Sequence, residues 1–115
     1  MLTEVNYVDG GGGSNIDFAN PEHQDNISVA YGSWSASIVT TKKPRYILVN
    51  FNRTGDMSIW LIDVQTSTAR KIGYNGGFQY TSVTFSDIVQ IVSDTAFQIK
   101  GQGGGTYNYQ VCWWY

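Results

Sequence analysis

Residues 101–115, GQGGGTYNYQVCWWY, join a glycine-rich run to a strongly aromatic segment. Large apolar and polar side chains alternate along it, with one face carrying Tyr107, Tyr109, Val111, Trp113 and Tyr115. A repeat of two residues is typical of a half-buried strand, and aromatic side chains suit a pleated surface that packs against another layer. Chain ends usually fray unless they are packed. The pattern therefore predicts a final strand inserted into a sheet, with the rest of the chain built around it.

Short strand signals recur along the rest of the chain, separated by turns rich in Gly, Asn, Asp and Pro. The predicted strands are residues 27–31, 34–40, 45–51, 57–64, 69–74, 80–86, 88–92 and 96–100. Residues 20–26 have the composition of a loop, and no stretch combines helical apolar spacing with caps at both ends. Eight or nine short strands in this length predict an all-β fold, an antiparallel, jelly-roll-like β-sandwich.

The glycine-rich stretch near the start of the chain suggests a boundary. Residues 9–14, DGGGGS, cannot hold a fixed conformation by themselves. We predict an N-terminal arm or hinge over residues 1–14 and a single β-sandwich domain over residues 15–115, with a glycine-rich hairpin as the alternative for the first part. A length of 115 residues fits one compact domain.

Two predicted strands, residues 45–51 and 57–64, are apolar on both faces. The outer face of a small lone sandwich should be polar, so this excess indicates that part of the outer face is covered, most simply by sister subunits. On the final strand, Cys112 and Trp114 lie on the face opposite to the predicted core. We therefore expect these two residues at a subunit interface, or Trp114 under a neighbouring loop.

The composition argues against several classes of function. Only 14% of residues are charged and the formal net charge is −2, so a nucleic-acid partner is not expected. The one basic cluster, Lys42, Lys43 and Arg45, is interpreted as a solvated strand entrance. No apolar run is long enough to predict membrane insertion. Weakly ionised, polar surfaces suit assembly or contact with sugars.

Residues for catalysis are scarce. His23 is the only histidine and is distant in sequence from the single cysteine, Cys112, so a nucleophile with a histidine base is not expected. The lone cysteine cannot form an internal disulfide, which fits folding in a reducing cytoplasm. Glu22, His23 and Asp25 are only a weak candidate for a cation site. The sequence predicts no enzyme activity, no catalytic residues, no metal and no cofactor.

Aromatic residues beside predicted turns are the candidates for ligand binding, because loops on a rigid sheet often carry function. Sugar rings stack on aromatic faces, and neighbouring amides supply hydrogen bonds. The candidates are Trp34, Tyr74, Asn75, Phe78 and Tyr80. Packing in the core or at an interface is the alternative for each aromatic residue.

The order of motifs from residue 26 to the end resembles a known family. The motifs are NISVAYGSW (26–34), KPRYILV (43–49), SIWLIDV (58–64), GYNGGFQY (73–80), TAFQIK (95–100), GQGGG (101–105) and TYNYQVCWWY (106–115). This series resembles the C-terminal β-sandwich domain of phage and prophage tail fibre or minor structural proteins of Gram-positive bacteria. Such domains often close long chains, whereas this sequence has only about 25 residues ahead of the matching part.

The resemblance implies a virion protein, made in the host cytoplasm and assembled as a homotrimer with other virion proteins. It implies a tail fibre, tail tip or head fibre protein that binds the host surface, with bacterial surface polysaccharide as the partner. The alternative is a purely structural virion protein, for capsid decoration or tail assembly, that docks through its N-terminal arm. A cellular lectin-like module is a third possibility. The resemblance transfers no binding residue.

Overall fold

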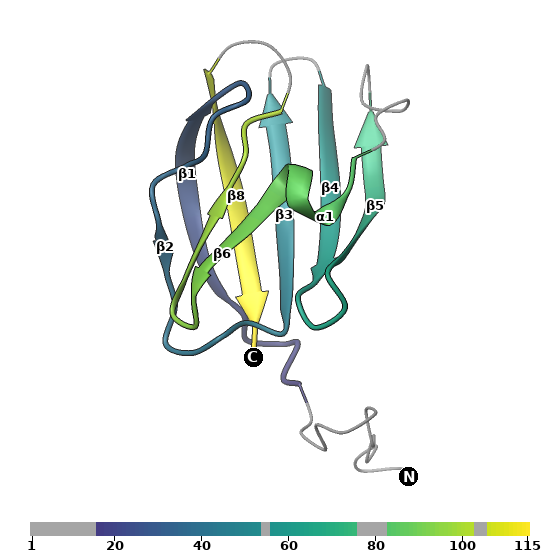
Figure 1. Cartoon of the computed structure of the whole chain (residues 1–115). Helices are drawn as coiled ribbons and strands as arrows, with labels where there is room; N and C mark the ends of the chain where they lie inside the picture. Colours follow the sequence, from purple (N-terminus) through teal and green to yellow (C-terminus); the bar gives the residue numbers. More distant parts are fainter. Residues whose placement is uncertain (1–15, 54–55, 76–82, 103–105) are drawn as a thin grey trace, which may run out of the picture.

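The computed structural model describes residues 16–53, 56–75, 83–102 and 106–115. Nearly all the regular structure in these ranges is β-strand, arranged in two antiparallel sheets (Figure 1). The elements are β1 (Glu22–Ala30), β2 (Ile38–Val39), β3 (Tyr46–Arg53), β4 (Asp56–Asp63), β5 (Thr68–Asn75), α1 (Phe85–Ile88), β6 (Val89–Ser93), β7 (Ala96–Ile99) and β8 (Thr106–Trp114). The predicted all-β sandwich is confirmed.

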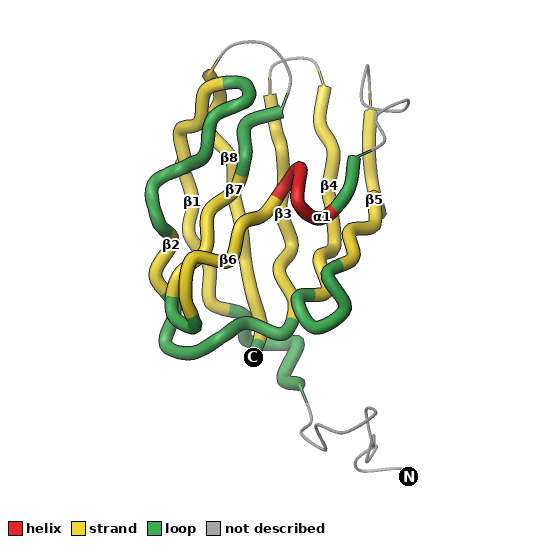
Figure 2. The backbone as a smooth tube through the Cα atoms, in the orientation of Figure 1, coloured by secondary structure: helices red, strands yellow, loops and turns green. Residues whose placement is uncertain are grey.

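One sheet has five strands in the order β1-β8-β3-β4-β5, and the other has three in the order β2-β7-β6. The smaller sheet lies in front of the larger one in Figure 1, and the short helix α1 leads into β6 (Figure 2). As predicted, β8 is inserted into a sheet, since it pairs with β1 on one side and β3 on the other. The final segment thus joins the first described strand to the centre of the sheet.

The core lies between the two sheets. Alternation along β8 buries Tyr109, Val111 and Trp113, which are at most 3% exposed. Tyr109 meets Phe51 of β3 edge to face, with ring centroids 4.9 Å apart, and Trp113 meets Phe97 of β7 at 5.6 Å. Edge-to-face pairs are the favoured arrangement for aromatic rings. The predicted inward face of the final strand is therefore the core face, with Tyr115 half-buried at its end.

The opposite face of the large sheet is also apolar near its centre. The half-buried side chains there are Leu48, Met57, Ile59, Leu61 and Cys112. This pattern agrees with the two-sided apolar character of residues 45–51 and 57–64. We call these five residues the outer apolar face.

Three local predictions were wrong. Residues 22–26 belong to β1 and not to a loop, because Glu22 and His23 pair with β8 and the ladder shifts register between Gln24 and Ile27, next to Asn26 at φ 57°. Of residues 34–40, only β2 forms a strand. The end of the predicted strand 80–86 falls in α1, where Thr84 and Asp87 form a capping box.

The predicted arm, residues 1–14, lies outside the described residues, as do residues 80–82 of that strand. In the described part of the chain, no helix is long and apolar enough to cross a membrane.

Candidate functional site

A pocket of about 490 Å³ lies at the end of the sandwich where β8 finishes. Three segments that are far apart in the sequence meet there: the approach to β1, the loop from β2 to β3, and the end of β8 (Figure 1). The lining residues are Asp17, Asn20, Glu22, Lys42, Lys43, Trp113, Trp114 and Tyr115. We call this the β8-end pocket.

Strand register explains how these residues meet. Glu22, the first residue of β1, is the antiparallel partner of Trp113 on β8. Directly opposite residues of neighbouring strands project to the same face of a sheet, so their side chains can touch. The next residue, Trp114, projects to the outer face beside Tyr46 of β3. Two consecutive tryptophans thus place one ring in the core and one on the outer face, both at the same end of the sandwich.

A hydrogen-bonded network holds the inner wall of the pocket. The indole N–H of Trp113 donates to Glu22 Oε2 at 3.1 Å and to the Tyr115 hydroxyl at 3.1 Å. The Tyr115 hydroxyl donates to the same carboxylate oxygen at 2.7 Å and accepts from the backbone N–H of Thr41 at 2.9 Å. Hydrogen bonds to an ionised carboxylate are shorter and stronger than neutral ones. The network therefore fixes β1, β8 and the β2–β3 loop against one another.

The outer wall is aromatic. Trp114 is half-buried, and its indole N–H donates to the backbone oxygen of Phe18 at 3.1 Å. The Phe18 ring lies 5.5 Å from the Trp114 ring and 5.8 Å from Tyr46, centroid to centroid, yet 57% of Phe18 is exposed. Trp114 thus packs against the segment that precedes β1 in its own chain.

The turn beside Phe18 is stabilised by Asp17. Its carboxylate accepts hydrogen bonds from the Ala19 N–H and the Asn20 side-chain amide, both at 3.0 Å. The bond from Asn20 contributes most to lowering the pKa of Asp17 below its ordinary value, with a further contribution from Ala19. The aspartate is thus an ionised turn residue on the pocket wall.

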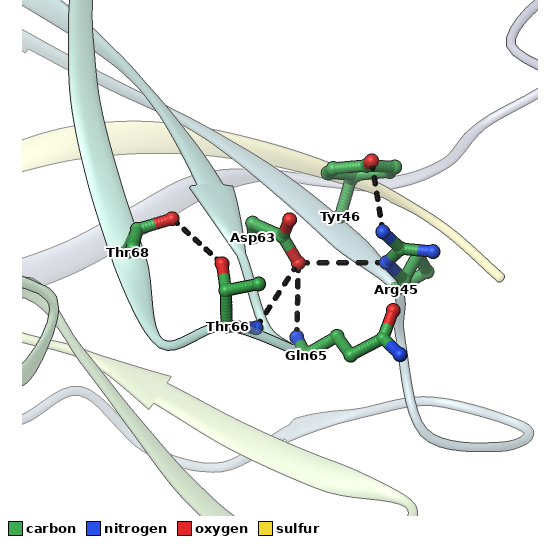
Figure 3. Close-up of polar contacts among 6 residues, drawn as sticks. All are labelled: Arg45, Tyr46, Asp63, Gln65, Thr66 and Thr68. Atoms are coloured by element: carbon green, nitrogen blue, oxygen red, sulfur yellow. Dashed lines mark hydrogen bonds and ion pairs between the residues drawn. The ribbon is translucent and has the colours of Figure 1, made fainter. Parts of the chain in front are cut away.

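A second cluster of polar contacts stabilises the same end of the sheet (Figure 3). Asp63 Oδ1 accepts from Arg45 Nε at 3.4 Å, from Gln65 N–H at 3.0 Å and from Thr66 N–H at 3.4 Å. The Arg45 guanidinium also donates to the Tyr46 hydroxyl at 3.2 Å, and its backbone N–H donates to the carbonyl oxygen of Trp114 at 2.7 Å. These contacts connect the end of β8 to the β4–β5 turn.

The chemistry of this pocket suits recognition of a polar ring. Aromatic faces pack against the C–H face of a sugar, while carboxylate, amide and ammonium groups bond its hydroxyls. A volume of about 490 Å³ is within the usual range for small-molecule sites. Of the two tryptophans in the lining, the half-buried Trp114 offers the more accessible ring, since Trp113 is only 3% exposed.

The predicted ligand-binding residues are not brought together in the described ranges. Trp34 follows β1, half-buried beneath Lys100, whose Nζ lies 5.6 Å from the centroid of its ring. Tyr74 is 51% exposed on β5, at the other edge of the large sheet, with Lys71 Nζ 4.8 Å from its ring centroid. The side chain of Asn75 and all of Phe78 and Tyr80 lie outside the description. Their binding role stays a prediction.

The predicted interface residues do share a face. Cys112 and Trp114 are half-buried on the outer side of β8, and burial raises the pKa of the Cys112 thiol. Whether a second subunit covers them stays a prediction.

Sequence reasoning missed most of the β8-end pocket. Lys42 and Lys43 are exposed, as a solvated strand entrance predicts, whereas Glu22 lies in β1 and not in the predicted loop. The signal that was present is the pair of adjacent tryptophans followed by Tyr115, whose partners only the pairing of β1 with β8 could reveal.

Comparisons of the chain with protein-family models, curated proteins and solved structures found no match.

Proposed function

We propose that the chain is a non-enzymatic phage virion protein that binds a glycan of the bacterial surface through the β8-end pocket. The observation that carries the proposal is the composition of that pocket, whose lining combines the Trp114 ring with side chains able to bond hydroxyls, among them Asn20, Lys42 and Lys43. The virion assignment, as a tail fibre, tail tip or head fibre component made in the host cytoplasm, is supported by the motif series from residue 26 to residue 115.

The pocket is preorganised for binding. The hydrogen bonds among Glu22, Trp113 and Tyr115 hold the inner wall in place, so a ligand that packs against this wall need not order these side chains. Single sugar sites are commonly weak, and a homotrimer would present three such sites to one cell surface. Linked sites raise the overall affinity without new contacts at any site.

An array of bacterial wall polysaccharides tests the proposal. We expect binding to at least one polysaccharide, with a loss of about tenfold or more in Trp114→Ala, a scale taken from the roughly 1–3 kcal/mol that stacking of a nucleic-acid base on an aromatic side chain contributes. Trp34→Ala is the matched control, since it removes the other half-buried tryptophan outside the pocket. Equal losses in the two variants would argue against the pocket.

A second candidate function is assembly of the virion, favoured by the outer apolar face. Leu48, Ile59 and Leu61 form a continuous apolar stretch across β3 and β4, where a solvated sheet face would carry polar side chains. In that case the chain is a capsid decoration or tail assembly protein that docks on its neighbours.

Sedimentation of the wild type and of Leu61→Lys tests whether copies of the chain pack through the outer apolar face. A wild-type oligomer that dissociates in Leu61→Lys supports packing of copies through the outer apolar face. A stable 12.8 kDa monomer at micromolar concentration would exclude the trimer in solution. Deletion of residues 1–13 tests whether the N-terminal arm docks the protein on the particle. If the shortened protein is no longer incorporated into particles, and the wild type binds no polysaccharide on the array, the assembly role is favoured.

A further inference from the structure

Hydrogen bonds hold the backbone of the loop that carries Lys42 and Lys43 at the β8-end pocket. The Thr40 hydroxyl donates to the carbonyl oxygen of Lys42 at 2.8 Å, and the next N–H, that of Thr41, donates to the Tyr115 hydroxyl at 2.9 Å. Lys43 is followed by the buried Pro44, which restricts the backbone of the residue before it. The loop that presents both lysines is therefore anchored to the end of β8, although the lysine side chains are exposed.

The carboxylates of the pocket are already occupied by neutral donors. Glu22 Oε2 accepts from Trp113 and Tyr115, and both oxygens of Asp17 accept from its own turn. Neither carboxylate forms an ion pair within 4.0 Å with Lys42 or Lys43 in the described ranges. Lys42 instead lies over the Tyr115 ring, with Nζ 5.3 Å from the centroid, and its side chain is exposed.

The nearby Arg45 provides a contrast. Its guanidinium is bonded to Asp63, and both side chains are 22% exposed, so this cation belongs to the scaffold. The two lysines next to the pocket have no such partner among the described residues. Positive groups beside an aromatic wall favour a ring that carries a negative charge, because each ammonium can donate to the anion in place of water.

We propose that the β8-end pocket selects an anionic saccharide, with Lys42 and Lys43 donating to its acidic substituent while Trp114 packs against the ring. This inference depends on the proposed glycan-binding function. Carboxylate and phosphate substituents share the required chemistry, so the experiment below is arranged to distinguish them.

To test this, each acidic wall polysaccharide is printed on the array beside a neutralised form of the same polysaccharide. Carboxyl groups are reduced to alcohols in one set, and phosphate esters are removed in the other. We expect the acidic form to bind about tenfold more tightly than its neutral match, and a Lys42→Gln and Lys43→Gln double variant to lose that preference. Exposed ion pairs are worth up to roughly fivefold each in affinity, which sets this scale. Binding should also weaken as salt rises.

Arg70→Gln is the matched control, since Arg70 is an exposed cation on β5 outside the pocket. It removes one positive charge from the protein and should leave the preference intact. Lys42 and Lys43 are exposed, so the double variant should fold, which its melting temperature checks.

The outcomes separate the two claims. Equal binding of acidic and neutral forms, or a preference that survives in the double variant, overturns the anionic selectivity and leaves glycan binding standing. A loss of the preference in Arg70→Gln also overturns it, because a general charge effect would then explain the data. No binding to any polysaccharide overturns both. Loss of binding only after carboxyl reduction identifies the carboxylate, and loss only after phosphate removal identifies the phosphate.

Discussion

Gly101, in the connection from β7 to β8, is the described glycine at which an added Cβ atom would meet the nearest neighbour. A Cβ atom at Gly101 would lie 2.1 Å from the carbonyl oxygen of Ala30, whereas ordinary contacts begin at 3.4 Å. The oxygen must therefore retreat by about 1.3 Å, the difference between these two distances. The same junction holds three backbone hydrogen bonds, from Gly32 to Gly101, from Gly101 to Ser33 and from Ser33 to Ala30, of 2.9–3.0 Å.

Each of these hydrogen bonds contributes about 1 kcal/mol, so their disruption predicts a loss of about 3 kcal/mol in Gly101→Ala. That is a large part of the 5–15 kcal/mol that stabilises a typical domain. Urea denaturation followed by tryptophan fluorescence measures the free energy of unfolding, and an unchanged slope shows that the compactness of both states is preserved.

Two other glycines serve as matched controls for the same substitution. Gly32→Ala meets no atom within 4 Å, but its φ of +73° is unfavourable for a side chain, so we expect a loss of about 1–2 kcal/mol. Gly73→Ala meets only Ile59, at 3.6 Å, and should change stability by less than about 1 kcal/mol. A Gly101→Ala protein within about 1 kcal/mol of the wild type, or Gly73→Ala as damaging as Gly101→Ala, would refute the close-contact argument.

Three further predictions concern polar groups. The pKa of Asp87 lies below its ordinary value of 3.8, chiefly because the backbone N–H of Thr84 donates to the carboxylate. The capping box therefore stabilises the protein above pH 3.8, and this contribution is lost as the pH falls through the lowered pKa. The Asp87→Asn variant should lack that part of the acid transition, as measured by denaturation between pH 2 and pH 6. Arg45→Lys should lose about 1 kcal/mol, measured by urea denaturation, because an ammonium cannot bond both Asp63 and Tyr46 with a planar fork; an unchanged stability would contradict this. Burial raises the pKa of the Cys112 thiol, so its alkylation at pH 8 should be slower than that of a free cysteine, and equal rates would show that the thiol is accessible.

The fold was largely predictable because the alternation of apolar and polar residues along a strand indicates which of its faces is buried. On β8 the period of two residues correctly identified Tyr109, Val111 and Trp113 as core. The same logic identified β3 and β4 as apolar on both faces, which the outer apolar face now locates. These signals are local, so a single sequence is enough to detect them.

The secondary-structure prediction failed where pairing with a distant segment, and not the local composition, determined the structure. Residues 22–26 have the composition of a loop, yet they form part of β1 because Glu22, His23 and Gln24 pair with β8. The positive φ of Asn26 accommodates the shift in register between Gln24 and Ile27. Asparagine is among the few residues that tolerate this conformation. The one-turn helix α1 was missed because four residues are too short for a helical apolar period.

The candidate site was the least predictable part. Its walls come from three segments separated by up to 98 positions, from Asp17 to Tyr115, and no local pattern connects them. Sequence reasoning selected aromatic residues beside turns, but Trp34 follows β1 and bridges to Lys100, whereas Tyr74 lies on β5 at the edge of the large sheet. Only the register of β1 with β8 shows that Glu22 meets Trp113 and Tyr115.

The indole N–H signals of the four tryptophans offer the most direct test of glycan binding in the β8-end pocket. In a nitrogen-15 correlation spectrum of the labelled protein, titrated with a polysaccharide fragment that binds on the array, each tryptophan reports on its own surroundings. We predict that the signals of Trp113 and Trp114 shift, while those of Trp34 and Trp60 stay in place. Shifts confined to Trp34 or Trp60, with Trp114 unchanged, would contradict the account.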